Sequence, residues 1–209
     1  KWRPRIDTLP NARHRTLLNV ILGETLEHKR FFDLALAGRS EFYTSYTPYQ
    51  PELSQGVLQA LFEYQSMICE LTGLEVSNAS LYDGVTALVE AVHMTIGRGR
   101  SRVLVSSGVD PRAVEALCTA GRGASYEPEV FEGAPAVTDD VAAVVVQHPN
   151  VYGVLEPVRE RFAMAHDAGA AAIQICDPLS LGVLASPGEL GADIAVGEGQ
   201  GLGNHLHYG

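Results

Sequence analysis

The clearest hydrophobic pattern in the chain lies between Ser54 and Gly73. Apolar side chains recur there at helical spacing, at positions 57, 58, 61, 62, 67, 68 and 71. Such spacing places apolar side chains on one face of a helix. Serine is a favoured N-cap residue, and glycine is favoured just after the last helical turn. The pattern therefore predicts an amphipathic helix that Ser54 caps and Gly73 ends.

After Gly73, short strand-like segments alternate with helix-like ones. Strand character is found at 74–80, 102–107, 125–131, 141–147, 171–176 and 192–196, and helical character at 84–97, 110–121 and 156–169. The run VAAVVVQ at 141–147 is apolar almost throughout, as in strands buried on both faces. Asp110 is the expected N-cap of its helix, with Pro111 in the first turn. This alternation predicts an α/β fold, a mostly parallel sheet sandwiched by helices.

The first part of the chain differs in charge from the rest. Residues 1–39 carry eight Lys or Arg and four acidic residues, whereas the remainder carries seven basic and twenty-one acidic ones. Residues 12–38 have apolar positions at helical spacing, broken near Gly23. We therefore expect a helical, basic N-terminal arm over 1–38 and a second domain over 39–209. The arm is either solvated or docked on an acidic surface, of this chain or of a partner.

Composition narrows the class of protein. The net charge of −10 argues against nucleic acid as the main partner. No apolar run reaches the roughly 20 residues that a membrane-spanning helix needs, and no signal peptide is visible. The three cysteines, Cys69, Cys118 and Cys176, are widely spaced, which is typical of reduced thiols in a core. We expect a cytoplasmic protein that has no membrane partner.

Polar residues and glycines follow several of the predicted strands. Ligands bind beyond the carboxyl ends of the strands in sheets of this kind, so candidate site residues come from these positions. They are Tyr82, Asp83, Gly84, Thr86, Ser106, Ser107, His148, Pro149, Asn150, Asp177, Glu198, Gln200, His205 and His207. After the last strand, glycine at 197, 199, 201 and 203 indicates that some group approaches the backbone closely. We expect this glycine-rich mouth to lie near Asp177 and Tyr82.

Two carboxylates of the predicted site, Asp177 and Asp83, allow two interpretations each. Asp177 ends a buried strand, where it either serves a ligand or caps a turn. Gly84 and Thr86 open a helix whose free N–H groups favour an anion. Asp83 beside them either caps that helix or opposes a phosphate. With Asp83 and Glu198 at one edge, we expect an acidic cleft that rejects phosphate.

The two histidines after the last strand are the least determined candidates. His205 and His207 have a spacing found in metal sites, but no third ligand is fixed by the sequence, so we expect no metal. The candidates for a catalytic role at the mouth are Glu198, Gln200, His205 and His207.

Residues 40–91, SEFYTSYTPYQPELSQGVLQALFEYQSMICELTGLEVSNASLYDGVTALVEA, carry a specific pattern. The stretch closely resembles subunit 1 of the two-subunit glycine dehydrogenase (decarboxylating), the P-protein of the glycine cleavage system. Three later stretches match the same family in the same order: VVVQHPNVYGVLE, CDPLSLGVLASPGELGADI and VGEGQGLGN. The resemblance covers Arg39 to Gly209, about four-fifths of the chain. Residues 1–38 carry no recognisable part of the family's pattern, and we expect the family's C-terminal domain to be absent.

The resemblance implies a fold and an activity. It implies the large domain of type I pyridoxal-phosphate (PLP) enzymes, which are aminotransferase-like. It implies a complex that decarboxylates glycine and passes the aminomethyl group to the lipoyl arm of the carrier H-protein. In this family the lysine that holds PLP belongs to the other subunit, so this chain alone is expected to be inactive.

The lysines of the chain agree with that implication. Lys1 and Lys29 are the only two, both in the N-terminal arm, and covalent attachment of PLP requires a lysine amine. We therefore expect PLP in the partner subunit only. Gly197 to Gln200 match the Gly-Glu-Gly-Gln motif of subunit 1. The resemblance implies that the remaining cofactor positions are vestigial, namely Tyr82, Gly84, Thr86 and Asp177.

The chain also departs from the family. After Gln200 the family usually reads Pro-Leu-Gly-Asn-Pro-Leu-Ser-Phe-Gly, whereas residues 201–209 read Gly-Leu-Gly-Asn-His-Leu-His-Tyr-Gly. His148 and Tyr152 also stand where Gln and Phe are common. Two alternatives therefore stay open: a stand-alone enzyme that uses the histidine-bearing mouth, with or without a metal, and a non-catalytic scaffold subunit.

Aromatic residues between the arm and the first clear helix suggest an interface. Aromatic side chains interleaved with prolines are costly to leave in water and are typical interface anchors. We expect the segment 43–50 to pack against a partner subunit or the chain's own helices through Tyr43, Tyr46, Tyr49 and Gln50.

Overall fold

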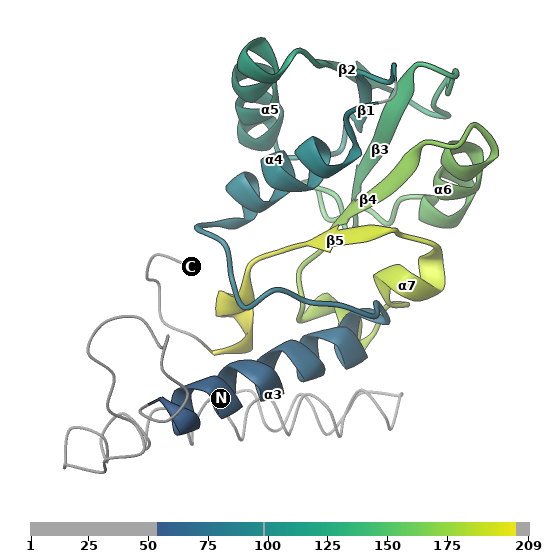
Figure 1. Ribbon diagram of the computed structural model, residues 1–209. Helices are drawn as coiled ribbons and strands as arrows, with labels where there is room; N and C mark the ends of the chain where they lie inside the picture. Colours follow the sequence, from purple (N-terminus) through teal and green to yellow (C-terminus); the bar gives the residue numbers. More distant parts are fainter. Residues whose placement is uncertain (1–53, 98, 204–209) are drawn as a thin grey trace.

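A computed structural model describes residues 54–97 and 99–203 (Figure 1). The elements are, in chain order, α3 (Gln55–Thr72), α4 (Gly84–Thr95), β1 (Arg102–Ser106), α5 (Pro111–Ala124), β2 (Glu127–Phe131), β3 (Val141–Gln147), α6 (Val158–Asp167), β4 (Ala171–Ile175), η2 (Ser180–Gly182), α7 (Pro187–Leu190), β5 (Ile194–Val196) and η3 (Gly199–Leu202). Several predicted features lie outside the described residues, namely the arm 1–38, the interface residues Tyr43, Tyr46, Tyr49 and Gln50, and both His205 and His207.

The five strands form one sheet in the order β2-β1-β3-β4-β5. Every neighbouring pair is parallel. Strands β1 and β3 are buried along nearly their whole length, as the apolar run at 141–147 predicts. The predicted α/β class with a parallel sheet between helices is therefore confirmed.

Helices cover both faces of this sheet (Figure 1). On one face α4 and α5 pack on β1, β3 and β4 through a core that includes Leu88, Val105 and Leu117. On the other face α6 packs through Phe162 and Ala165. A third cluster joins α3 to the segments that follow β4 and β5, through Leu71, Cys176, Leu181 and Leu202. The third cluster places α3 beside the end of the sheet where β5 lies.

The ends of the helices follow the sequence with one exception. Gly73 has φ of 72°, in the left-handed region that favours glycine, and its N–H donates to Cys69 O. Asp110 caps α5 by accepting a hydrogen bond from the N–H of Arg112 at 2.9 Å. Ser54 stands at the N-cap position of α3 as predicted, but its side chain makes no capping hydrogen bond.

The predicted strand at 74–80 is wrong. The segment is irregular and pairs with no strand of the described sheet. Its central apolar side chain, Val76, is 84% exposed, and Ser77 O accepts a hydrogen bond from the Gln65 side chain of α3. The alternating pattern LEVSNAS is typical of a strand, but a strand also needs a neighbour with which to pair. Instead, the segment connects α3 to the start of α4.

Two other expectations concern the thiols and the membrane. Cys69, Cys118 and Cys176 are all free cysteines, and Cys176, which directly follows β4, is buried. Burial raises the pKa of the Cys176 thiol to about 12. Across the described residues, no helix is both long enough and apolar enough to span a bilayer.

Candidate functional site

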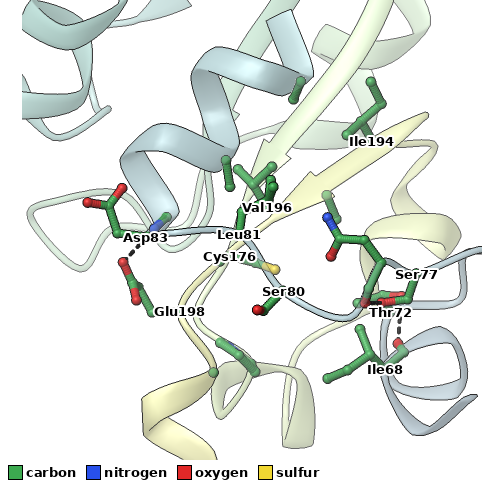
Figure 2. A pocket seen from close by; sticks show the side chains of 18 of the residues that line it. Ile68, Thr72, Ser77, Ser80, Leu81, Asp83, Cys176, Ile194, Val196 and Glu198 are labelled. Carbon is green, nitrogen blue, oxygen red and sulfur yellow. Dashed lines mark hydrogen bonds between the residues drawn. The ribbon is translucent and has the colours of Figure 1, made fainter. Parts of the chain in front are cut away.

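Two loops far apart in the sequence meet at the carboxyl end of β5. One opens α4 at Asp83 and Gly84, and the other is the glycine-rich mouth that follows Val196. The N–H of Gly84 donates a hydrogen bond to Oε1 of Glu198 at 2.6 Å, across 114 residues of sequence (Figure 2). The structure thus brings Glu198, a catalytic candidate, against Gly84, a candidate for cofactor binding.

A cavity of about 270 Å³ lies beside this contact, between α3, residues 77–81, α4 and the mouth. Its apolar lining comes from α3, the end of β4 and β5, and Figure 2 shows Ile68, Cys176 and Val196 turned toward it. Its polar lining comes from Ser77, Ser80, Glu90, Glu198 and Gln200. An apolar floor with a few polar groups at the rim is the usual form of a small-molecule site.

The start of α4 is already occupied by carboxylates of this chain. Asp83 caps the helix, because its Oδ1 accepts a hydrogen bond from the N–H of Thr86 at 2.7 Å. Glu198 accepts the hydrogen bond from the N–H of Gly84. A helix N-terminus attracts anions through these free N–H groups and the helix dipole. Here two negative side chains already accept hydrogen bonds from two of these groups.

Asp177 and Tyr82 also lie at this end of the sheet. Oδ1 of Asp177 accepts a hydrogen bond from the N–H of Leu179 at 3.0 Å, so the carboxylate caps its own turn. A Cβ at Gly201 would lie 3.3 Å from that oxygen, which places the mouth against Asp177 as expected. The side chain of Tyr82 is largely exposed.

A second polar cluster fills the crevice between the carboxyl ends of β1 and β3. The strand order reverses at this point, which is where ligands bind in many doubly wound sheets. Arg161 of α6 pairs with Glu156 at 2.6 Å and also donates to the Ser106 hydroxyl at 3.0 Å. Glu156 in turn accepts a hydrogen bond from Asn150, and a Cβ at Gly108 would lie only 2.5 Å from its carboxylate. The chain's own side chains therefore close this crevice.

His148 belongs to the same cluster. The N–H of Glu156 donates to Nδ1 of His148 at 3.1 Å, so the neutral ring carries its proton on Nε2. Burial lowers the pKa of His148, although the nearby Glu156 carboxylate acts in the opposite direction. A neutral histidine at the end of β3 follows from these contacts.

Sequence reasoning missed Glu156 and Arg161. A signal for Arg161 exists in hindsight, because it shares the buried face of α6 with Val158, Phe162 and Ala165. A charged side chain at such a core position needs a buried partner. Within residues 54–97 and 99–203, no three His, Cys, Asp or Glu side chains are grouped so that they could hold a metal ion.

Comparison with known proteins decides the family. A family model described as glycine cleavage system P-protein matches residues 19–209. The chain belongs to the glycine cleavage system P-protein family. The resemblance found in residues 40–91 and the three later stretches is thereby confirmed. The match begins well before Arg39, so the expectation that the family pattern is absent from all of residues 1–38 is wrong for residues 19–38.

Individual relatives support the same family assignment. Probable glycine dehydrogenase (decarboxylating) subunit 1 of Coprothermobacter proteolyticus is 52% identical over 178 residues, which cover 81% of this chain and 41% of the relative. The subunit 1 from Moorella thermoacetica is 50% identical over 185 residues, covering 83% and 42%. The chain thus spans about two-fifths of the length of the curated P-protein relatives it matches.

Solved structures agree on the P-protein fold. A crystal structure of glycine decarboxylase (P-protein) of the glycine cleavage system, in inhibitor-bound form, matches with a TM-score of 0.76 and 51% identity, over 84% of this chain and 42% of that one. A putative O-acetylhomoserine (thiol)-lyase from Campylobacter jejuni, solved with a pyridoxyl-lysine phosphate, matches with a TM-score of 0.57 at 11% identity, over 78% and 44%. The second likeness concerns the fold alone, which is the α/β fold of type I PLP enzymes.

Proposed function

We propose that this chain is the subunit of a glycine decarboxylase that lacks the PLP-binding lysine. It acts with a partner subunit that bears PLP on a lysine. Together the two subunits decarboxylate glycine and pass the aminomethyl group to the lipoyl arm of the H-protein. The family assignment supports the reaction class, and the residues of this chain support the division of labour.

The position of the lysines carries the proposal. Residues 54–203 contain none, so no lysine follows any of the five strands. A PLP enzyme of this fold holds its cofactor through a lysine amine at the carboxyl edge of the sheet, and no other side chain replaces that amine. The lysine must therefore come from outside residues 54–203, and we assign it to a partner subunit.

The residues around the mouth do not fit PLP either. When bound, PLP supplies an electron sink for the loss of CO₂ and needs an anion site for its phosphate. The start of α4 meets that phosphate with the carboxylates of Asp83 and Glu198. We accordingly assign PLP to the partner subunit and no catalytic step to a PLP held here.

Reconstitution tests the proposal. The chain, the lysine-bearing subunit and lipoyl H-protein are mixed, and the release of ¹⁴CO₂ from carboxyl-labelled glycine is followed. We expect release only when both subunits are present, and loss of release when the cofactor lysine of the partner subunit is replaced by alanine.

Two results would overturn the proposal in different ways. Release by this chain without a partner would favour a stand-alone enzyme. Equal release by the partner subunit with and without this chain would favour a scaffold.

The three free cysteines fit a reducing compartment, and we extend the proposal to a cytoplasmic location.

A further inference from the structure

Two N–H groups at the start of α4 donate hydrogen bonds to carboxylates of this chain. The first four N–H groups of any helix lack intrahelical partners and must find others. Here the N–H of Gly84 donates to Glu198 and that of Thr86 to the Asp83 side chain, whereas the N–H of Ala87 makes the first intrahelical hydrogen bond, to Asp83 O. Of the two side chains that accept the hydrogen bonds of Gly84 and Thr86, only that of Glu198 comes from a distant part of the chain. Its carboxylate does for α4 what a bound anion does for other helices.

The backbone of α4 is shaped to receive this side chain. A Cβ at Gly84 would lie 3.0 Å from Oε1, 3.2 Å from Cγ and 3.3 Å from Cδ of Glu198. Gly84 is not among the glycines with positive φ, so its backbone conformation does not require glycine. The space that glycine leaves is therefore what allows the Glu198 side chain to reach the first turn of the helix (Figure 2).

Glu198 also ties the mouth to α4. It stands two residues after β5 and is the N-cap residue of η3, so its position sets where residues 199–202 run. A Cβ at Gly197 would lie 2.3 Å from Cys176 O, so the chain on the other side of Glu198 is held against the end of β4. A ligand that displaced Glu198 would have to separate these two loops.

We propose that Glu198 is a built-in anion that closes the start of α4 to phosphate-bearing ligands. The carboxylate occupies one of the donors that such a ligand would need, the N–H of Gly84, and Asp83 beside it repels a second negative group. The inference deepens the proposed function, because it gives the physical reason why this subunit takes no PLP. It rests on the contacts of this chain alone and can be tested without the partner.

The test measures phosphate binding to the whole chain and three variants. Wild type, Glu198→Ala, Glu198→Gln and Glu90→Gln are titrated with inorganic phosphate, and the thermal midpoint is compared with chloride at equal ionic strength. Glu90 is the matched control, because it is another carboxylate of the cavity lining but makes no contact with the start of α4. A parallel titration uses pyridoxal phosphate, read by absorbance.

We expect phosphate to leave the midpoints of wild type and Glu90→Gln unchanged and to raise that of Glu198→Ala. Its phosphate affinity should exceed that of wild type by at least about tenfold. Glu198→Gln keeps an acceptor oxygen without the charge and should lie between them, and it carries the test if Glu198→Ala does not fold. Phosphate or pyridoxal phosphate binding to wild type as tight as to Glu198→Ala would overturn the inference. So would the absence of any gain in both Glu198 variants. Either failure leaves the reconstitution result for the proposed function unaffected.

Discussion

Replacing Arg161 by methionine should destabilise the fold more than the loss of a surface ion pair would. The side chains of Arg161 and Glu156 are only 9% and 11% exposed, and their charged atoms are 2.6 Å apart. The guanidinium also donates to Ser106 and lies 5.3 Å from the centroid of the Phe131 ring. Removing it leaves the Glu156 charge buried without its cation.

The magnitude follows from what remains around Glu156. Breaking a buried ion pair from one side costs about 3–5 kcal/mol of unfolding free energy. Asn150 still donates to the carboxylate at 2.7 Å, and the substitution removes Nε of Arg161, a buried N–H without a partner among the described residues. We therefore expect the lower end, about 3 kcal/mol. With a urea slope of about 1–3 kcal/mol per M, the midpoint should fall by roughly 1–3 M.

The assay is urea unfolding followed by far-ultraviolet circular dichroism. Arg112→Met is the matched control, because Arg112 pairs with Asp110 at the surface and is 86% exposed. We expect no measurable change in its midpoint. The double variant Arg161→Met/Glu156→Gln should recover more than half of the loss, since both charges are then gone. Equal midpoints for Arg161→Met and Arg112→Met would refute the reasoning.

Three more predictions concern single buried groups. Gln174 is fully buried in β4 with neither amide atom bonded within the described part of the chain, so Gln174→Met should raise the free energy of unfolding by about 1–2 kcal/mol, and a loss in the same urea assay would contradict this. Burial lowers the pKa of His148, so the unfolded chain binds the proton more readily than the folded chain. Wild type should therefore lose stability as the pH falls below about 6.5. His148→Gln should flatten that part of the pH profile of stability, and an unchanged profile would show that His148 is not responsible. With a thiol pKa raised to about 12, Cys176 should resist a thiol reagent at pH 8 until urea is added, in a background where Cys69 and Cys118 are serine; rapid labelling of the native chain would contradict its burial.

Local signals in the sequence were enough to predict most elements of the fold. The glycine that ends α3, the capping aspartate of α5 and the apolar run of β3 each act through neighbouring residues or through burial on both faces. The segment 74–80 shows the limit of such signals. Its alternation is that of a strand, yet whether a partner strand lies beside it depends on residues far along the chain.

The same limit applies to the candidate site. That polar residues gather at the carboxyl ends of the strands follows from the parallel topology. The contact between Glu198 and Gly84 does not follow from the topology, because it joins positions 114 residues apart and depends on how β5 is placed beside α4. Arg161 is not identified by apolar spacing, because that pattern does not reveal a charge on the buried face of α6.

The central claim is that the cofactor lysine lies on the partner subunit and not on this chain. The assembled complex is loaded with PLP, reduced with borohydride, and both chains are digested and mapped by mass spectrometry. We predict a stoichiometric pyridoxyl group on one lysine of the partner subunit, and none on Lys1 or Lys29 of this chain. Stoichiometric labelling of Lys29, with the partner's lysines unlabelled, would contradict the account.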